Sequence, residues 1–167
     1  MKFRPCIDIH NGKVKQIVGG TLNDDSVNLI ENFVADKDAE YYAKMFKNDK
    51  LTGGHVIMLG PGNEEQALKA LKAYPSGLQI GGGITAQNAV HYLENGATHV
   101  IVTSYVFKDG QVNTTNLSKI VSEVGKEKLV LDLSCRKRES TYFVVTDRWQ
   151  KFTSFEVNKE NLSKLVN

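Results

Sequence analysis

Two aspartates occur in nearly the same local sequence, far apart in the chain. Asp8 lies in the segment CIDIH and Asp132 in the segment VLDLS. Aliphatic residues typical of a buried strand flank each carboxylate, and an ionised group is costly there without a partner. For either aspartate alone, capping of the following loop is the simpler interpretation. The repeated context favours a pair that acts on one substrate as general base and general acid.

A run of three glycines follows another apolar segment and leads directly into a helical pattern. The run is Gly81–Gly83, followed by Ile84 and Thr85. Glycines let the backbone approach a ligand closely, and the first amides of a helix offer donors and a favourable dipole for phosphate. Thr103 and Ser104 end the next apolar segment and add two hydroxyls. We therefore predict a phosphate-binding site here, although a glycine run can also serve only as a tight turn.

Other kinds of chemistry lack their sequence motifs. The chain has no G-x-G-x-x-G fingerprint, no G-x-x-x-x-G-K-S/T loop and no G-x-S-x-G elbow. Cys6 and Cys135 are far apart, and the four histidines form no i, i+4 pair. We therefore expect two free thiols and no metal site. Trp149 is the only tryptophan. Such a residue usually packs in a core, but its polar neighbours allow a loop position against a flat ring.

The composition is that of an ordinary globular protein. The 167 residues are 41% hydrophobic and 24% charged, with a net charge of +2. This balance argues against disorder and gives no basic footprint for nucleic acid. The basic run 136–138 is interpreted as a solvated loop. No apolar stretch approaches the ~20 residues of a membrane helix, and the first ten residues do not resemble a secretory signal. We expect a cytoplasmic protein that binds neither nucleic acid nor membrane.

The candidate residues lie in an alternation of short apolar strands and longer helical patterns. Asn63 with Gln66 predicts a capping box at one helix start, and Thr85 is predicted to cap the next helix. Asn113 and Asn158 predict two further helix starts. Residues 14–18 and 141–146 are predicted to be extended segments outside the main alternation. The predicted strands are 3–9, 56–59, 78–80, 99–103 and 129–133, and the predicted helices are 38–48, 63–74, 85–96, 113–124 and one that begins at 158.

Alternating strands and helices of this kind are typical of a parallel sheet covered by helices. Two architectures fit the pattern. A doubly wound sheet is complete with five strands, whereas a (β/α)8 barrel normally takes ~250 residues. Periodicity alone slightly favours the doubly wound sheet. The spacing of Asp8 and Asp132 favours the barrel, because it is about half of that length and would place the two residues on strands that face each other across the mouth.

Several segments, taken in order, resemble one enzyme family. They are CIDI at 6–9, NGKV at 11–14, GGGI at 81–84, VIVTS at 100–104, LDL at 131–133 and WQ at 149–150. Their order and spacing are similar to those of the phosphoribosylformimino-5-aminoimidazole carboxamide ribotide isomerases of histidine biosynthesis. VKQIVGG at 14–20 and DLSCRK at 132–137 resemble the eukaryotic branch. The combination of segments carries the resemblance, and it covers essentially the whole chain.

The resemblance implies an α/β fold of the (β/α)8 TIM-barrel family, with residues 1–167 forming one incomplete domain of about five β/α units. It also implies an aldose-ketose isomerase that catalyses an Amadori rearrangement without cofactor or metal. The match to Asp132 is the general acid that protonates the ribose ring oxygen. The match to Asp8 is the general base that removes the C2 proton after ring opening. The implied substrate- and phosphate-binding residues, including two from the segments of the eukaryotic branch, are Gly20, Gly82, Gly83, Thr103, Ser104, Arg136 and Trp149.

The chain stops where the resemblance leads us to expect three more strands, with a second phosphate site and an assisting hydroxyl residue. Two other functions therefore stay open. One is an inactive phosphate-binding half-barrel. The other is the sister cyclase barrel, which places a lysine where this chain has Gln16, next to Lys15. We expect a bis-phosphorylated small-molecule substrate, a monomeric full-length protein, and self-association of this chain through an uncovered inner face. That face is expected to be lined by Ile7, Ile57, Ile80 and Ile101.

Overall fold

The computed structural model describes residues 2–17, 31–146 and 151–166. Its main feature is a seven-stranded sheet in the order β3-β2-β1-β4-β5-β6-β9. Two antiparallel strands, β2 (Lys13–Ile17) and β3 (Glu31–Val34), extend the sheet beside β1. The parallel strands are β1 (Cys6–His10), β4 (Gly54–Met58), β5 (Leu78–Gly81), β6 (Val100–Val102) and β9 (Leu129–Leu131).

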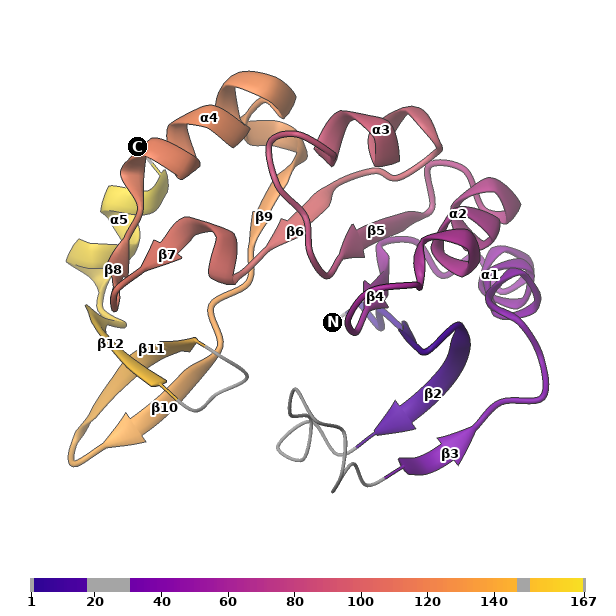
Figure 1. Ribbon diagram of the computed structural model, residues 1–167, viewed down its shortest axis with the longest axis horizontal. Coiled ribbons are helices and arrows are strands. Elements are labelled where there is room, and N and C mark those ends of the chain that lie inside the picture. Colours follow the sequence, from indigo (N-terminus) through magenta and orange to yellow (C-terminus); the bar gives the residue numbers. More distant parts are fainter. Residues whose placement is uncertain (1, 18–30, 147–150, 167) are drawn as a thin grey trace.

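The parallel strands follow one another across the sheet in chain order, without a reversal. A doubly wound sheet reverses its strand order at a switch point, whereas a barrel winds in one direction. The preference that periodicity alone gave to the doubly wound sheet is therefore wrong, and the barrel-family fold is confirmed. Five β/α units are present, and the sheet is an open arc that ends at β3 and β9 (Figure 1).

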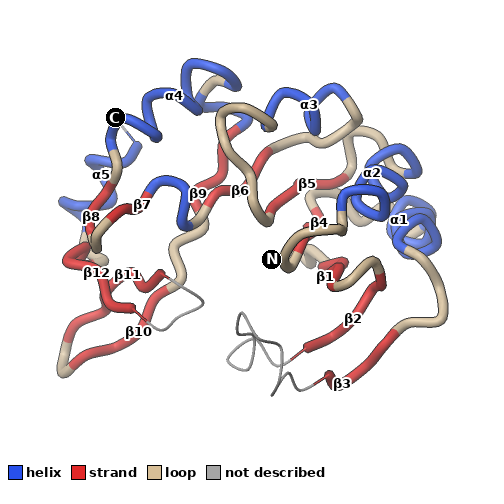
Figure 2. Tube along the Cα trace, in the orientation of Figure 1, coloured by secondary structure: helices blue, strands red, loops and turns tan. Residues whose placement is uncertain are grey.

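The helices of these units lie on the convex side of the arc. Figure 2 shows α1 to α4 along the outer side of the curved sheet, with α5 near the beginning of α4. Each helix begins within a few residues of its predicted position. The helices are α1 (Ala39–Asn48), α2 (Glu64–Ala73), α3 (Ala89–Glu94), α4 (Thr114–Val124) and α5 (Lys159–Val166).

Strand pairing sets one row of aliphatic side chains under the helices. In this row each side chain is at most 1% exposed. The prediction that Ile7 and Ile80 line the inner face is wrong, because both belong to this covered row. Ile57 and Ile101 alternate with it and face the inner, concave side. An alternating pattern does not itself say which set meets the helices. The covered row consists of Ile7, Val56, Ile80 and Val100.

A small three-stranded sheet is inserted between β9 and α5. It consists of β10 (Cys135–Arg138), β11 (Thr141–Thr146) and β12 (Lys151–Glu156). The predicted extended segment 141–146 is confirmed as β11. The solvated loop predicted at 136–138 is wrong, because these residues pair with β11 as strand β10. Their side chains are exposed, and the guanidinium group of Arg138 lies 4.4 Å from the ring centroid of Phe143.

A hairpin follows β6 and contacts this insertion. The polypeptide passes through a short 3-10 turn, Ser104–Val106, and then forms β7 (Phe107–Lys108) and β8 (Gln111–Val112). The carbonyl of Gly110 in the hairpin turn accepts a hydrogen bond from the backbone N–H of Ser154 at 2.8 Å. The insertion is thereby attached to the end of β6 as well as to β9.

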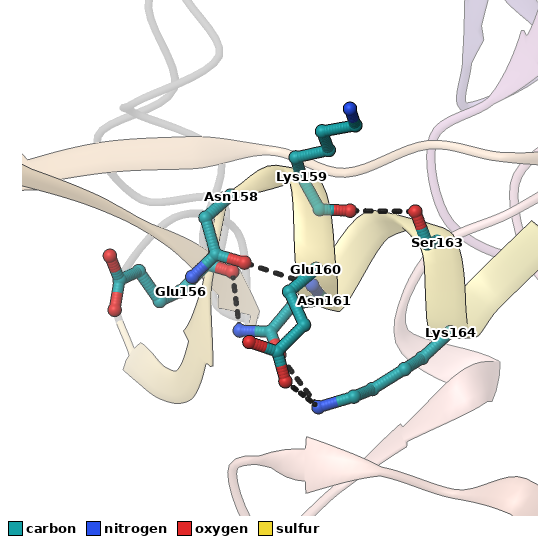
Figure 3. A network of polar contacts seen from close by, with 7 residues as sticks. All are labelled: Glu156, Asn158, Lys159, Glu160, Asn161, Ser163 and Lys164. Atoms are coloured by element: carbon teal, nitrogen blue, oxygen red, sulfur yellow. Dashed lines mark hydrogen bonds and ion pairs between the residues drawn. The ribbon is translucent and has the colours of Figure 1, made fainter.

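The helix starts predicted at Asn113 and Asn158 are confirmed, and both asparagine side chains form caps. The Oδ1 of Asn113 accepts from the backbone N–H of Asn116 at 3.1 Å, at the start of α4. The Oδ1 of Asn158 accepts from the backbone N–H of Asn161 at 2.8 Å, as Figure 3 shows. The side chain of Asn161 in turn donates to the carbonyl of Glu156 at 3.0 Å, so that the start of α5 is bound to the end of β12.

The caps predicted at Asn63 and Thr85 are wrong, because neither side chain forms a cap hydrogen bond at the start of its helix. Asn63 is almost fully buried, and its Oδ1 accepts from the backbone N–H of Gly12 at 2.9 Å. The Oε1 of Gln66 accepts from the backbone N–H of Ala39, at the start of α1. Thr85 does not cap α3 with its side chain. Its backbone N–H donates to Oδ1 of Asn88, and α3 begins at Ala89.

Candidate active site

The structure places Asp8 and Asp132 on the inner face of the arc. Asp8 lies in β1 between Ile7 and Ile9, which are buried under the helices, so its side chain points the other way. Asp132 directly follows β9, and its backbone N–H extends the ladder by donating to the carbonyl of Val102 at 2.9 Å. The two carboxylates therefore occupy the same face, on the first and fifth parallel strands.

The surroundings of Asp132 favour its protonated form. Partial burial of the carboxyl group raises its pKa above the usual range, and the imidazole of His55 partly offsets this effect. A carboxyl group that keeps its proton to higher pH is better suited to donate that proton. The direction of the shift therefore fits the general-acid role that the resemblance implies.

His55 is a functional candidate that the sequence analysis missed. It lies in β4, half-buried, and pairs across the sheet with Cys6 and Gln79. Burial lowers the pKa of its imidazole, as does the Arg4 cation, while the carboxylates of Asp132 and Asp8 raise it. The imidazole is thus the neighbour that both carboxylates share. The sequence signal that could have found it is its place in the segment GHVIM. Residue 55 alternates there with the apolar Val56, which predicts that the two side chains lie on opposite faces of the sheet.

The two thiols lie near the two carboxylates. The Sγ of Cys6 donates to Oδ1 of Asp8 at 3.2 Å. Burial of the sulfur, followed by the charge of Asp8 and this hydrogen bond, raises the pKa of the Cys6 thiol beyond the range of ordinary cysteines. The Sγ of Cys135 donates instead to the backbone carbonyl of Leu133 at 2.9 Å. Burial and the charge of Asp132 raise the pKa of its thiol as well. Both thiols are free, as expected.

The glycine run forms a turn between β5 and α3 in which two positions differ sharply. Gly82 has a φ of +92°, and a Cβ there would lie 2.0 Å from the carbonyl oxygen of Met58. Close packing therefore accounts for this glycine. Gly83 has a φ of +68°, with open space where its Cβ would be. Asn88 fixes the turn by donating to the carbonyl of Gly83 at 3.1 Å. The exposed part of the turn is therefore the part around Gly83.

The other predicted binding residues occupy two regions. Thr103 and Ser104 are exposed at the end of β6, the strand next to β5. They thus follow the carboxyl end of the strand beside the glycine turn. Arg136 is exposed in β10, with its guanidinium group 5.4 Å from the ring centroid of Phe152. Gly20 and Trp149 lie outside the described residues.

Metal sites and membrane-spanning helices are the two other features considered for the described residues. Within 2–17, 31–146 and 151–166, no three His, Cys, Asp or Glu side chains gather in a way that could hold a metal ion. None of the described helices is both long and apolar enough to cross a membrane.

Comparisons with known proteins identify the family. A profile of the family described as "Histidine biosynthesis protein" matches residues 2–164. The chain is 56% identical, over 173 aligned residues, to the 1-(5-phosphoribosyl)-5-((5-phosphoribosylamino)methylideneamino) imidazole-4-carboxamide isomerase, chloroplastic, of Medicago truncatula. It is 48% identical to the isomerases of the same name from Neurospora crassa and Yarrowia lipolytica.

The aligned regions cover almost all of this chain but only part of each relative. They include 100%, 98% and 99% of the chain, and 55%, 65% and 64% of the Medicago, Neurospora and Yarrowia proteins. The chain therefore spans between about half and two thirds of the length of these relatives. With a family profile that matches nearly every residue and relatives at this level of identity, the chain belongs to the histidine biosynthesis protein family.

Proposed function

We propose that the protein carrying this chain is an isomerase that converts a bis-phosphorylated phosphoribosylamino imidazole carboxamide from aminoaldose to aminoketose. The observation that carries the proposal is the position of Asp8 and Asp132, on one inner face at the first and fifth parallel strands. The printed names of the relatives support the same reaction.

In the first step Asp132 acts as general acid. Its proton passes to the ribose ring oxygen as the bond between that oxygen and C1 breaks. The lone pair of the amino nitrogen on C1 forms the C=N bond of an open-chain iminium ion. Because burial raises the pKa of Asp132, the carboxyl group retains its proton closer to neutral pH than an ordinary aspartate does.

In the second step Asp8 acts as general base. Its carboxylate takes the proton from C2, and the electrons of the C–H bond form a C1–C2 double bond while the iminium nitrogen regains its lone pair. The resulting enolamine tautomerises to the aminoketose. Substrate and product are isomers, so the reaction consumes no oxidant or reductant. The absence of dinucleotide motifs from the sequence is compatible with such chemistry.

One substrate phosphate is proposed to bind at the ends of β5 and β6. The open space around Gly83 and the exposed hydroxyls of Thr103 and Ser104 support this position. Gly82, Gly20, Arg136 and Trp149 are proposed as further substrate contacts on the basis of the family resemblance. Contacts to a phosphate remote from the reacting carbon atoms help to orient those atoms and therefore affect turnover as well as affinity.

The protein is proposed to act in the cytoplasm. Two free, accessible thiols suit a reducing compartment. The Medicago relative is named as chloroplastic, so imaging of a fluorescent fusion in the source cells is the direct test.

The full-length protein is proposed to be a monomer. The isolated chain is expected to self-associate, because the edge strand β3 is exposed and carries Phe33 at 54% exposure. Sedimentation of both forms tests this expectation.

The proposed reaction is tested by giving the purified full-length protein the bis-phosphorylated aminoaldose and identifying the product by mass spectrometry and NMR. We expect the aminoketose, with the same mass as the substrate. An Asp8→Asn variant is the control for contaminating host isomerase. No turnover of the aminoaldose, together with ring closure of separately supplied aminoketose and ammonia to an imidazole product, would instead show the sister cyclase activity. Phosphate binding without turnover of either compound would show a non-catalytic phosphate-binding protein, and either result would overturn the proposal.

A further inference from the structure

A thiol donates a side-chain hydrogen bond to Asp8. Cys6 and Asp8 are two residues apart on β1, so their side chains point to the same face of the sheet. The Sγ–Oδ1 distance of 3.2 Å lies within hydrogen-bonding range for sulfur. The neighbouring Ile7 and Ile9 are buried under the helices and fix the orientation of the strand. The thiol is therefore held beside the carboxylate by the backbone itself.

The chemistry of this thiol is that of a hydrogen-bond donor. A cysteine acts as a nucleophile only as its thiolate, which a low pKa favours. The pKa of the Cys6 thiol is shifted the other way, by burial of the sulfur and by the Asp8 carboxylate. Cys6 thus keeps its proton at neutral pH, although the residue is accessible to solvent. A neutral donor beside a carboxylate stabilises the ionised form of that carboxylate.

We propose that Cys6 is a positioning residue for Asp8, whose thiol holds Oδ1 so that Oδ2 is presented to the substrate as the ionised general base. This inference rests on the isomerase proposed above, and it assigns a function to a residue that forms no part of the two-aspartate scheme. A carboxylate oxygen held by a donor is restricted in rotation, which favours one orientation for proton abstraction.

The chain contains a matched control for this inference. Cys135 is the other of its two cysteines and is also free and accessible. Its thiol donates to the carbonyl of Leu133 rather than to a carboxylate. Loss of the Cys135 thiol therefore removes a cysteine of similar exposure without removing the contact to Asp8.

The kinetic test compares Cys6→Ala, Cys6→Ser and Cys135→Ala in the full-length protein, with kcat and KM measured separately. Without the thiol donor, the Asp8 carboxylate can rotate away from the orientation that favours proton abstraction. The kcat of Cys6→Ala should therefore fall about fivefold, the value of one hydrogen bond, with little change in KM. Cys6→Ser keeps a donor and should retain the parental kcat, as should Cys135→Ala. A parental kcat in Cys6→Ala would overturn the proposal.

A second test needs neither substrate nor a Cys6 variant. Iodoacetamide reacts with thiolates, so the alkylation rate of each cysteine, read by peptide mass spectrometry, reports its ionisation. In Asp8→Asn the charge beside Cys6 is gone, and Cys6 should react about tenfold faster at pH 8, while Cys135 in the same sample keeps its rate. An unchanged Cys6 rate would show that the thiol does not interact with Asp8.

The two tests separate the failure of this inference from the failure of the proposed function. If the full-length protein shows no isomerase turnover, the proposed function is wrong, and the alkylation rates still decide whether Cys6 engages Asp8. If turnover is present but neither the kcat of Cys6→Ala nor the alkylation rate of Cys6 responds, the isomerase stands and the role of Cys6 is wrong.

Discussion

His55 and Asp132 influence each other's ionisation across the inner face, although β5 and β6 lie between their strands in the sheet. Burial lowers the pKa of the imidazole and raises the pKa of the carboxyl group, and the electrostatic interaction between the two groups partly offsets both shifts. A flat sheet would hold side chains on such distant strands well apart, because neighbouring strands are ~4.8 Å from each other. The curvature of the arc therefore brings the fifth parallel strand back towards the second.

A permanent charge at position 55 should change the pH profile of the enzyme. In His55→Lys the cation lowers the pKa of Asp132, so the acid loses its proton at lower pH. The basic limb of kcat should then move to lower pH. His55→Gln is the uncharged control and should leave the limb near the parental position. Basic limbs that coincide in both variants would show that residue 55 does not interact with the general acid.

Asp132 should lower the stability of the fold as the pH rises. Its folded-state pKa is raised by burial. Folding therefore favours the protonated carboxyl group, and this contribution is complete below the unfolded pKa of about 4 and is lost as the pH rises through the folded pKa. Asp132→Asn carries no charge at any pH. Its melting temperature should exceed the parental value at pH 7 and approach it below pH ~4. Calorimetry from pH 3.5 to 8 measures the melting temperatures of the parental protein and of Asp132→Asn. Melting curves that stay parallel at every pH would contradict the shift.

Gly82 and Gly83, which both have a positive φ, should respond differently to alanine. The added methyl group in Gly82→Ala would collide with the carbonyl oxygen of Met58, so we expect a loss of more than about 2 kcal/mol, or no stable fold. Gly83→Ala meets open space and pays only for its left-handed backbone, about 1 kcal/mol. Urea unfolding of both variants compares the losses. A larger loss in Gly83→Ala would show that the turn is packed differently.

Inorganic phosphate should bind near the exposed hydroxyls after β6. Each hydroxyl that donates to the anion contributes a charge-assisted hydrogen bond, so Thr103→Val and Ser104→Ala should each weaken binding about tenfold. Isothermal titration of the full-length protein measures the affinities. Ser118→Ala, on the exposed side of α4, is the control and should bind as the parent does. Parental affinity in both hydroxyl variants would place the phosphate elsewhere.

The features that the sequence predicted correctly are those that depend on near neighbours. Asn113 and Asn158 cap helices because the amide of the residue three positions later is within reach in any helix start. The strands and helices of the five units follow from apolar periodicity in the same way. Asp8 and Asp132 were found because each stands alone among aliphatic strand residues, where a carboxylate is unusual.

The features that it missed depend on which surfaces meet in the fold. Asn63 has the spacing of a cap, but its amide oxygen is taken by Gly12, 51 residues away. The inner and outer faces of β1 and β5 were not assigned, because the alternation of Ile7 or Ile80 with polar or small residues does not say which set meets the helices. The sequence contains four histidines and does not by itself show that His55 interacts with two carboxylates. That interaction depends on the curvature of the sheet. Local spacing carries no information on these long-range contacts.

The most direct test of the account is the turnover number of two single variants of the full-length protein. Asp8→Asn and Asp132→Asn each keep the shape of the side chain and remove its ability to transfer a proton. We predict that each lowers kcat by about 10²- to 10⁴-fold with a much smaller change in KM, because proton transfer contributes to the transition state rather than to substrate binding. Asp49→Asn, at the exposed end of α1, is the control and should turn over like the parent. Near-parental kcat in either Asp8→Asn or Asp132→Asn would contradict the assignment of these carboxylates as base and acid.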